Sequence, residues 1–126
     1  MIDIGIFIGC LILTVGVHEL GHMVVALLCG VRVEAFAIGF GKPILHKKLW
    51  GIDFRICPIL LGGYTKLAGE FKKHVSDGFL AQRYSKKACI LVAGVAMNIL
   101  LACICYWLNY KSISIGIWVD WQLVVN

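Results

Sequence analysis

Two long apolar segments dominate the pattern of hydrophobic and polar positions along the chain. The first runs from about residue 4 to residue 29 and the second from about residue 88 to residue 110. Each is at least as long as the roughly 20 apolar residues with which a helix crosses a bilayer, so each predicts a transmembrane helix. With 60% hydrophobic residues, 15% charged residues and a mean hydropathy of +0.88, the chain has the composition of an integral membrane protein.

Between these segments the pattern changes to the period of β-strands. Residues 31–38 alternate in part and begin with β-branched side chains, and residues 52–56 alternate strictly between apolar and other positions. A further short strand is expected at 44–50, and an apolar run broken by two glycines follows at 59–67. We expect a predominantly α-helical membrane protein with a small, membrane-associated antiparallel β element. Its exposed edge either pairs with an extended peptide or belongs to a sheet that simply connects the two helices.

The charges give this organisation an orientation. Every Lys and Arg except Lys111 lies between residues 32 and 87. The positive-inside rule therefore makes this connection cytoplasmic and puts the N-terminus outside, in a multi-pass protein of a cell membrane. The net charge of +5 then reflects topology, and we expect no nucleic acid partner.

We therefore expect one membrane domain, residues 1–126, in five consecutive parts. Its basic part faces membrane lipid, because Lys and Arg side chains near a bilayer attract anionic headgroups, and its tail is a strand or an interfacial segment. The parts are a transmembrane helix at 4–30, a β-rich cytoplasmic-side loop at 31–67, a basic interfacial segment at 68–87, a transmembrane helix at 88–110 and a tail at 111–126.

The first apolar segment contains the strongest candidate for chemistry, His18-Glu19-Leu20-Gly21-His22. On a helix, His18 and His22 lie about one turn apart on the same face, where two imidazoles can hold one Zn²⁺. Glu19 is close enough to act on a water molecule at the metal. Ionisable groups inside a membrane span are costly to bury and therefore indicate function. A pair of core histidines without a metal is the alternative, but it suits a helix with a polar face, which this segment lacks.

Other polar residues give weaker signals. Asn98 is a strongly polar side chain within the second apolar segment, and it hydrogen-bonds the first helix or a substrate backbone, or simply joins the two helices. His74 has the right side chain for a third metal ligand, but its place outside the apolar segments favours a surface histidine. The six cysteines form no Cys-x-x-Cys pair and are expected to fill space as small apolar side chains.

Several short motifs share their order and spacing with a known family. The His-Glu-x-x-His segment is followed by Gly30-Val-Arg-Val-Glu34, Ile38-Gly-Phe-Gly41, Gly62-Gly-Tyr-Thr-Lys-Leu67, Gln82-Arg83 and Ala93-Gly94-x-x-x-Asn98. Over residues 4–110 the chain closely resembles the N-terminal half of the site-2 proteases, especially the bacterial regulator-of-sigma-E protease branch.

The resemblance implies an intramembrane zinc metalloendopeptidase that cleaves transmembrane segments of membrane proteins in a bacterial plasma or inner membrane. It makes His18 and His22 the ligands of Zn²⁺ and Glu19 the general acid/base. It also implies that the strands within 31–67 form the family's membrane-reentrant β element, which holds the substrate in extended form. The expected substrate contacts are Gly62, Gly63, Tyr64 and Asn98.

The chain departs from the family pattern in two places. Val95 stands where the family commonly has proline, which alters a helix kink. The third zinc ligand, an aspartate that family members supply from a later helix, has no counterpart here, although a catalytic zinc site usually has three protein ligands. We expect the rest of a longer chain, or a partner, to supply it.

Three other functions fit the same residues. The chain is an active protease by itself, a catalytically inactive membrane remnant that binds zinc or a partner helix, or a zinc-handling membrane protein. The last needs a polar pathway across the bilayer, and only the histidine motif contributes to one.

Overall fold

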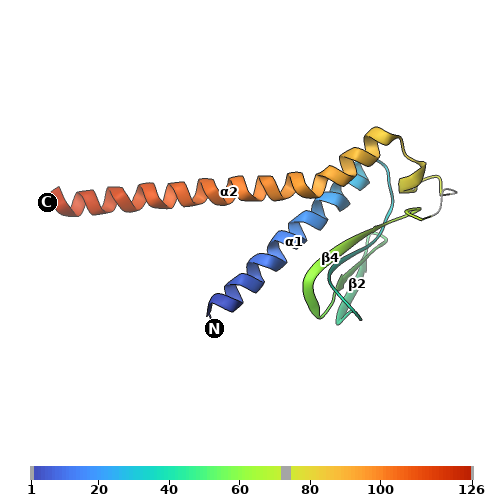
Figure 1. The fold of residues 1–126 in the computed structure, drawn as a ribbon, viewed down its shortest axis with the longest axis horizontal. Helices are drawn as coiled ribbons and strands as arrows, with labels where there is room; N and C mark the ends of the chain where they lie inside the picture. Colours follow the sequence, from blue (N-terminus) through green and yellow to red (C-terminus); the bar gives the residue numbers. More distant parts are fainter. Residues whose placement is uncertain (1, 72–74, 126) are drawn as a thin grey trace.

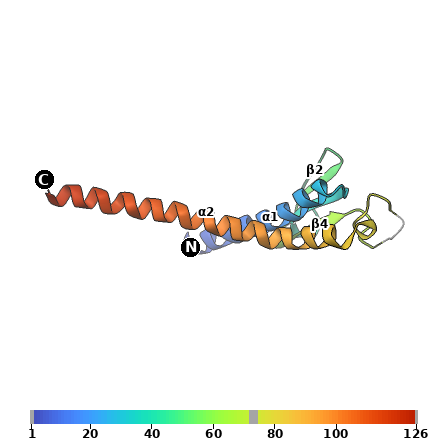
Figure 2. The ribbon, with the colours of Figure 1, turned by 90° about the horizontal axis from the view of Figure 1, so that it is seen from above.

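The computed structural model of the chain describes residues 2–71 and 75–125, with a long helix at each end and a small sheet between them. Helix α1 spans Ile2–Leu28 and helix α2 spans Tyr84–Val125. The C-terminal end of α1 lies against the first part of α2, and the helices diverge from there (Figure 1). Figure 2 shows from a second direction that α2 continues alone past the N-terminal end of α1.

Both helices expose apolar side chains along most of their length. Asp3–Leu28 and Tyr84–Ile113 are each long and apolar enough to cross a bilayer, and only 6% and 17% of their most apolar windows are buried inside the structure. The core helix of a soluble protein buries most of such a window. Large side chains such as Phe7 and Trp107 instead face outward. The two predicted apolar helices are therefore present, and their exposed apolar surfaces are of the kind that contacts a membrane or another protein.

The second helix is longer than the sequence predicts. It begins at Tyr84 rather than at residue 88, and it continues through residues 111–125, where we expected a strand or an interfacial segment. The strand alternative was wrong for these residues, and an interfacial position stays a prediction. The stretch after Tyr110 contains no proline. Extending a helix that already exists avoids the cost of nucleation, so the single glycine in this stretch does not end it.

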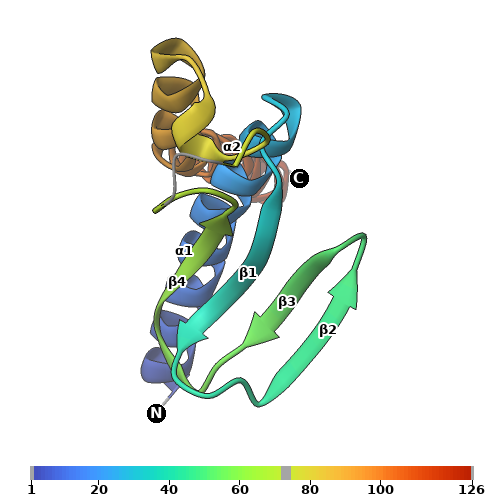
Figure 3. The same cartoon turned by 90° about the vertical axis from the view of Figure 1, so that its right-hand side faces the viewer.

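Four strands form one sheet beside α1, in the spatial order β2-β3-β1-β4. In chain order they are β1 (Val33–Phe40), β2 (Leu45–Leu49), β3 (Ile52–Ile56) and β4 (Ile59–Leu67). β1 pairs antiparallel with β4 and parallel with β3, while β2 and β3 form an antiparallel hairpin. Figure 3 shows β4 next to α1 and the hairpin farther away. The small sheet is as predicted, but it is mixed, and the expectation of a purely antiparallel sheet was wrong.

The parallel pairing follows from which strand is apolar. β3 places Phe54 and Ile56 opposite Phe36 and Ile38 of β1, whereas β2 carries two lysines and is exposed along its whole length. With β3 in the interior position, the apolar faces of β1 and β3 form one surface. The charged strand is left at the edge, where its lysines discourage pairing with other chains.

The core lies where α1, the sheet and the first part of α2 meet. Its buried side chains come from all three parts and include Met23, Ala26, Val33, Phe36 and Ile90. Gly21 lets the two helices approach closely, since a Cβ there would lie 2.6 Å from the carbonyl oxygen of Ala93.

The connection from β4 to α2 runs past the C-terminal end of α1. It contains a 3₁₀ turn, Phe79–Ala81, within the part that we expected to be a basic interfacial segment. Arg32 and Asp77 form an ion pair at 3.1 Å, and Lys86 Nζ donates to the carbonyl oxygen of Cys29 at 2.9 Å. The lysine thereby satisfies one of the carbonyl groups that a helix leaves free at its C-terminus.

Candidate metal centre

His18 and His22 project from α1 toward α2. Their Nε2 atoms lie 3.1 Å apart, because side chains four residues apart on a helix are neighbours. His22 Nδ1 lies 2.7 Å from the carbonyl oxygen of Ile90, and His18 Nδ1 lies 3.2 Å from the amide nitrogen of Asn98. Helix α2 therefore holds both rings by their Nδ1 atoms and leaves the two Nε2 atoms facing each other.

This geometry fits one metal ion. Two Zn–N bonds of about 2.0–2.1 Å at a tetrahedral angle put the nitrogens about 3.3 Å apart, close to the 3.1 Å in this structure. Gly94 of α2 faces the pair, and a Cβ there would lie 2.6 Å from His18 Nε2 and 2.5 Å from His22 Nε2. Glycine thus keeps open a space beside both nitrogens that any other side chain would fill.

Glu19 contacts strand β4. Thr65 Oγ1 lies 2.9 Å from Glu19 Oε2 and 2.9 Å from the Glu19 carbonyl oxygen, and its single proton serves one of them at a time. Gly63 permits this approach, because a Cβ there would lie 3.1 Å from Val15 Cγ1 and 3.2 Å from Glu19 Cγ. Thr65 therefore orients the carboxylate. The sequence did not single out this residue, since no local pattern links it to Glu19.

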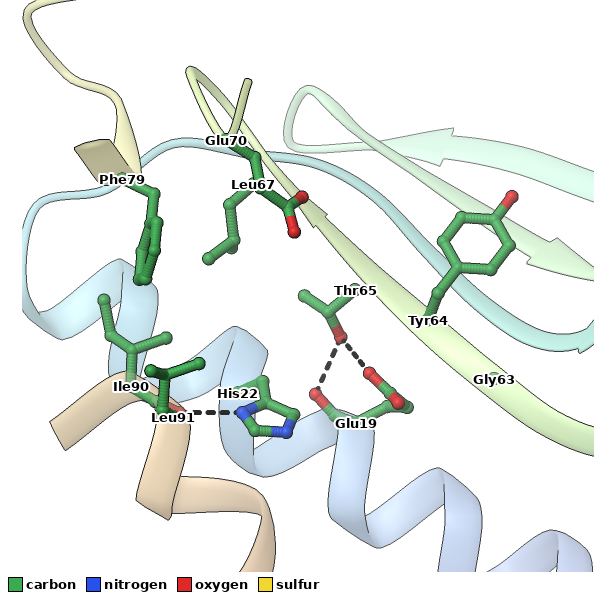
Figure 4. A pocket seen from close by; sticks show the side chains of 10 residues that line it. All are labelled: Glu19, His22, Gly63, Tyr64, Thr65, Leu67, Glu70, Phe79, Ile90 and Leu91. Carbon is green, nitrogen blue, oxygen red and sulfur yellow. Dashed lines mark hydrogen bonds between the residues drawn. The ribbon is translucent and has the colours of Figure 1, made fainter. Parts of the chain in front are cut away.

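A cavity of about 270 Å³ lies between α1, β4 and the start of α2. Figure 4 shows Glu19 and His22 at one side of it, the apolar side chains of Leu67, Phe79 and Ile90 along another, and the carboxylate of Glu70 beside Leu67. An apolar wall beside a carboxylate and an imidazole strengthens the electrostatic interactions of these groups. The cavity therefore brings a carboxylate and an imidazole to one side of a partly apolar space.

The four predicted substrate contacts lie in different surroundings. Gly63 and Tyr64 line the cavity, whereas Gly62 lies under the ring of Phe40, which occupies the place of its missing Cβ. Asn98 is hydrogen-bonded to His18. Contact of these residues with a substrate stays a prediction.

The side chain of Tyr64 points away from Glu19 (Figure 4). Arg55 lies within hydrogen-bond distance of it, at 3.4 Å from the phenol oxygen, and donates to Asp53 Oδ2 at 2.7 Å. The hydrogen bond to Asp53, followed by the one to Tyr64, raises the pKa of Arg55 above its ordinary value. The guanidinium therefore stays charged and bridges the two side chains across the outer face of the sheet.

Within residues 2–71 and 75–125, no group of three His, Cys, Asp or Glu side chains could hold a metal ion. Asp53 is paired with Arg55, and Asp77 is paired with Arg32. His74 lies outside the described residues. The described part of the chain therefore offers two imidazole nitrogens to a metal.

Comparison with known proteins places these residues in context. Residues 6–117 match the model of peptidase family M50. The chain is 40% identical over 115 residues to the regulator of sigma-E protease RseP of Escherichia coli K12. This match covers 86% of this chain and 25% of that protein. It is 40% identical over 110 residues to protease RseP of Yersinia pestis, covering 82% of this chain and 24% of that protein.

A protein of Neisseria meningitidis with "zinc metalloprotease" in its name is 38% identical over 110 residues. This match covers 83% of this chain and 25% of that protein. The chain thus spans about a quarter of the length of these relatives.

Proposed function

This chain belongs to peptidase family M50, and we propose that it forms the zinc-binding and water-activating part of an intramembrane metalloprotease of the site-2 type. Such a protease cleaves transmembrane segments of other membrane proteins. One observation carries the proposal: two imidazole Nε2 atoms lie 3.1 Å apart beside a space that Gly94 keeps open. An oriented glutamate follows the first of these histidines, as peptide hydrolysis at zinc requires.

The residues divide the work in the following way. His18 and His22 would hold zinc through Nε2, and the bound ion would supply the Lewis acidity that polarises a carbonyl and lowers the pKa of water. Glu19 takes the proton from the attacking water. When the Thr65 hydroxyl donates to Oε2, it holds the carboxylate in one orientation, and the other oxygen can accept that proton and pass it to the leaving amine.

The sheet suits a substrate that must be unwound. The carbonyl groups of a transmembrane helix are hydrogen-bonded within the helix, so a peptide bond there is accessible only after local unwinding. β4 lies at an edge of the sheet and carries Thr65, which contacts Glu19. A peptide that adds to β4 as a further strand regains the backbone hydrogen bonds that it loses on unwinding. We infer that the substrate strand lies along β4, with its scissile carbonyl near the histidine pair.

The third metal ligand comes, in this proposal, from the rest of a longer chain or from a partner. A catalytic zinc site usually has three protein ligands, and the described residues offer two. The match covers only 25% of the length of the Escherichia coli relative, so a segment of that kind can lie in the part of such a protein that this chain does not cover.

We also propose that α1 and α2 cross a bacterial inner membrane, with the N-terminus outside and residues 32–87 on the cytoplasmic side. The concentration of Lys and Arg in that connection supports the orientation. The basic residues then face the anionic headgroups of membrane lipid.

The test separates metal binding from peptide hydrolysis. In detergent-purified protein, Glu19→Gln keeps about as much zinc as the wild type, since the glutamate acts on water, whereas His22→Ala loses zinc. In cells, both variants lose cleavage of a tagged single-span membrane protein that is produced together with the full-length protein. Glu34→Gln is the matched control, because Glu34 is exposed and pairs with Lys66 on the sheet.

Cleavage by Glu19→Gln at the wild-type rate would refute the role of Glu19. Zinc uptake by the wild type without any cleavage would instead favour an inactive remnant that binds metal.

A further inference from the structure

A row of polar contacts runs from one side of the histidine pair to the other. The Ile90 carbonyl oxygen is 2.7 Å from His22 Nδ1, the two Nε2 atoms are 3.1 Å apart, and His18 Nδ1 is 3.2 Å from Asn98 Nδ2. The first of these contacts is drawn in Figure 4. Beyond the row, Asn98 Oδ1 is buried and has no hydrogen-bond partner in the part of the chain that the structure describes.

The protons in this row can be assigned from its ends. A peptide carbonyl only accepts, so His22 carries its proton on Nδ1, and its Nε2 is an acceptor when the ring is neutral. His18 must then donate from Nε2, which leaves its Nδ1 as an acceptor for the amide N–H of Asn98. Without metal, every contact in the row thus has one donor and one acceptor.

Metal binding requires a different arrangement at His18. A neutral imidazole that gives Nε2 to a metal carries its proton on Nδ1. His22 already has this tautomer, but His18 does not. In the other tautomer, Nδ1–H of His18 would face the N–H group of Asn98, donor against donor. If the carboxamide turns over, its Oδ1 accepts this proton instead.

We propose that Asn98 is a positioning residue that stabilises either tautomer of His18 by turning its carboxamide, and that Oδ1 accepts from Nδ1–H in the metal-binding form. This inference rests on the proposed zinc site. The proton of His18 leaves Nε2 and one returns to Nδ1 through solvent, so the ring stays neutral and no net proton is released. The buried Oδ1 gains its hydrogen bond in the same step.

Asparagine suits this task because its two ends differ. Its amide offers two donors and its oxygen two lone pairs at nearly the same reach, so a half-turn exchanges their roles. Partners of metal-bound histidines fix the tautomer and the ring orientation, and their loss typically lowers metal affinity about 10- to 100-fold. A residue that merely joins two helices has no such effect on one particular imidazole.

The experiment reads the ring tautomers directly. The 126-residue chain is labelled with ¹⁵N-histidine, purified in detergent and freed of metal with a chelator. Long-range proton–nitrogen correlation spectra then report which ring nitrogen carries the proton, with His18→Gln to assign the signals. We expect His18 protonated on Nε2 and His22 protonated on Nδ1. Titration with zinc moves the proton of His18 to Nδ1 and leaves that of His22 in place.

Two substitutions separate the ends of the amide. Asn98→Asp keeps an acceptor and loses the donor, so His18 is protonated on Nδ1 even without metal. Asn98→Leu removes both groups, so Nδ1 of His18 has no partner in either tautomer. The metal-free ring then stays protonated on Nε2, where it donates to His22, but zinc affinity falls about tenfold or more. Asn109→Leu is the matched control: Asn109 lies on the same helix, is exposed, and should leave spectra and affinity unchanged.

Metal-free Asn98→Asp with the His18 tautomer of the wild type would overturn the proposal, and so would Asn98→Leu with wild-type zinc affinity. The metal-free spectra decide the role of Asn98 without zinc. If the 126-residue wild type takes up no zinc, the proposed third ligand outside it is needed for metal binding, while the tautomers of the wild type and Asn98→Asp still support or overturn this inference.

Discussion

Three glycines set the distances on which the candidate site depends. Gly21 brings α1 against α2, Gly63 brings β4 against α1, and Gly94 leaves the space beside the two Nε2 atoms. In each case a Cβ would meet a neighbouring atom at less than ordinary contact distance. A substitution at any of these positions therefore changes the distances between the packed elements at the site, without necessarily changing the secondary structure.

Gly94→Ala is the sharpest test of this at the residue scale. The added methyl group would occupy the space beside both Nε2 atoms, so zinc affinity should fall by more than about tenfold while the chain stays helical. Competition with a chromophoric chelator measures the affinity, and far-ultraviolet circular dichroism measures the helix content. Gly9→Ala is the matched control, because a Cβ at Gly9 meets nothing within 4 Å. Equal affinities of the two variants would contradict the assigned role of Gly94.

At this scale the sequence predicts side chains but not their partners. The spacing of His18 and His22 is enough to predict that they share a face, since helix geometry fixes it. Asn98 stood out as a polar side chain in an apolar helix. Its contact with His18, like that of Thr65 with Glu19, joins distant parts of the chain and depends on how α2 and β4 pack on α1.

Strand β4 is the element that connects the sheet to the chemistry. It pairs with β1 along one side, and its inner face contacts α1 at Glu19. A single strand thus supports the carboxylate and, in the proposed function, carries the edge on which the substrate is held.

Thr65→Val tests this connection. Valine keeps the β-branched shape that suits a strand but cannot donate to Glu19. We expect cleavage by the full-length protein to slow about tenfold or more, because hydrogen bonds to charged groups are among the stronger ones, with zinc content unchanged. Thr14→Val is the control, since the Thr14 hydroxyl donates within α1, to the carbonyl oxygen of Cys10. Equal cleavage by both variants would mean that the hydroxyl of Thr65 does not orient the carboxylate.

The helices and strands themselves were largely predictable from the sequence, whereas the pairing of the strands with one another was not. The alternation of residues 52–56 gives the bounds of β3, and the two apolar segments give the two helices. The parallel pairing of β1 with β3 is absent from the local pattern, because it depends on which apolar face joins the surface over α1. The part of α2 after residue 110 was not predicted to be helical, although no residue in the tail ends a helix.

For the whole molecule, the family resemblance seen in the order of the motifs is confirmed by the match to peptidase family M50 over residues 6–117. The orientation in the membrane stays a prediction from the charges. This orientation matters to the proposed mechanism, because it decides from which side of the membrane a substrate reaches the sheet and its cavity.

Cysteine labelling in intact cells tests the orientation. In a chain whose six cysteines are replaced, Asp3→Cys should react with a membrane-impermeant maleimide added outside, and Ser76→Cys should react only after the membrane is permeabilised. Both positions are exposed in the structure, so accessibility within the protein is matched. The opposite labelling pattern would invert the predicted topology.

The divergence of α1 and α2 from one small region of contact has a mechanical consequence. Gly21, Ala93 and Gly94 are buried at this contact, whereas Phe7 and Trp107 are exposed on the arms that lead away from it. When two rods turn about the place where they touch, displacement grows with distance from that fulcrum. The histidine pair lies at the fulcrum, so the far ends of both helices can swing while the contacts of His22 with Ile90 and of His18 with Asn98 on α2 hardly change.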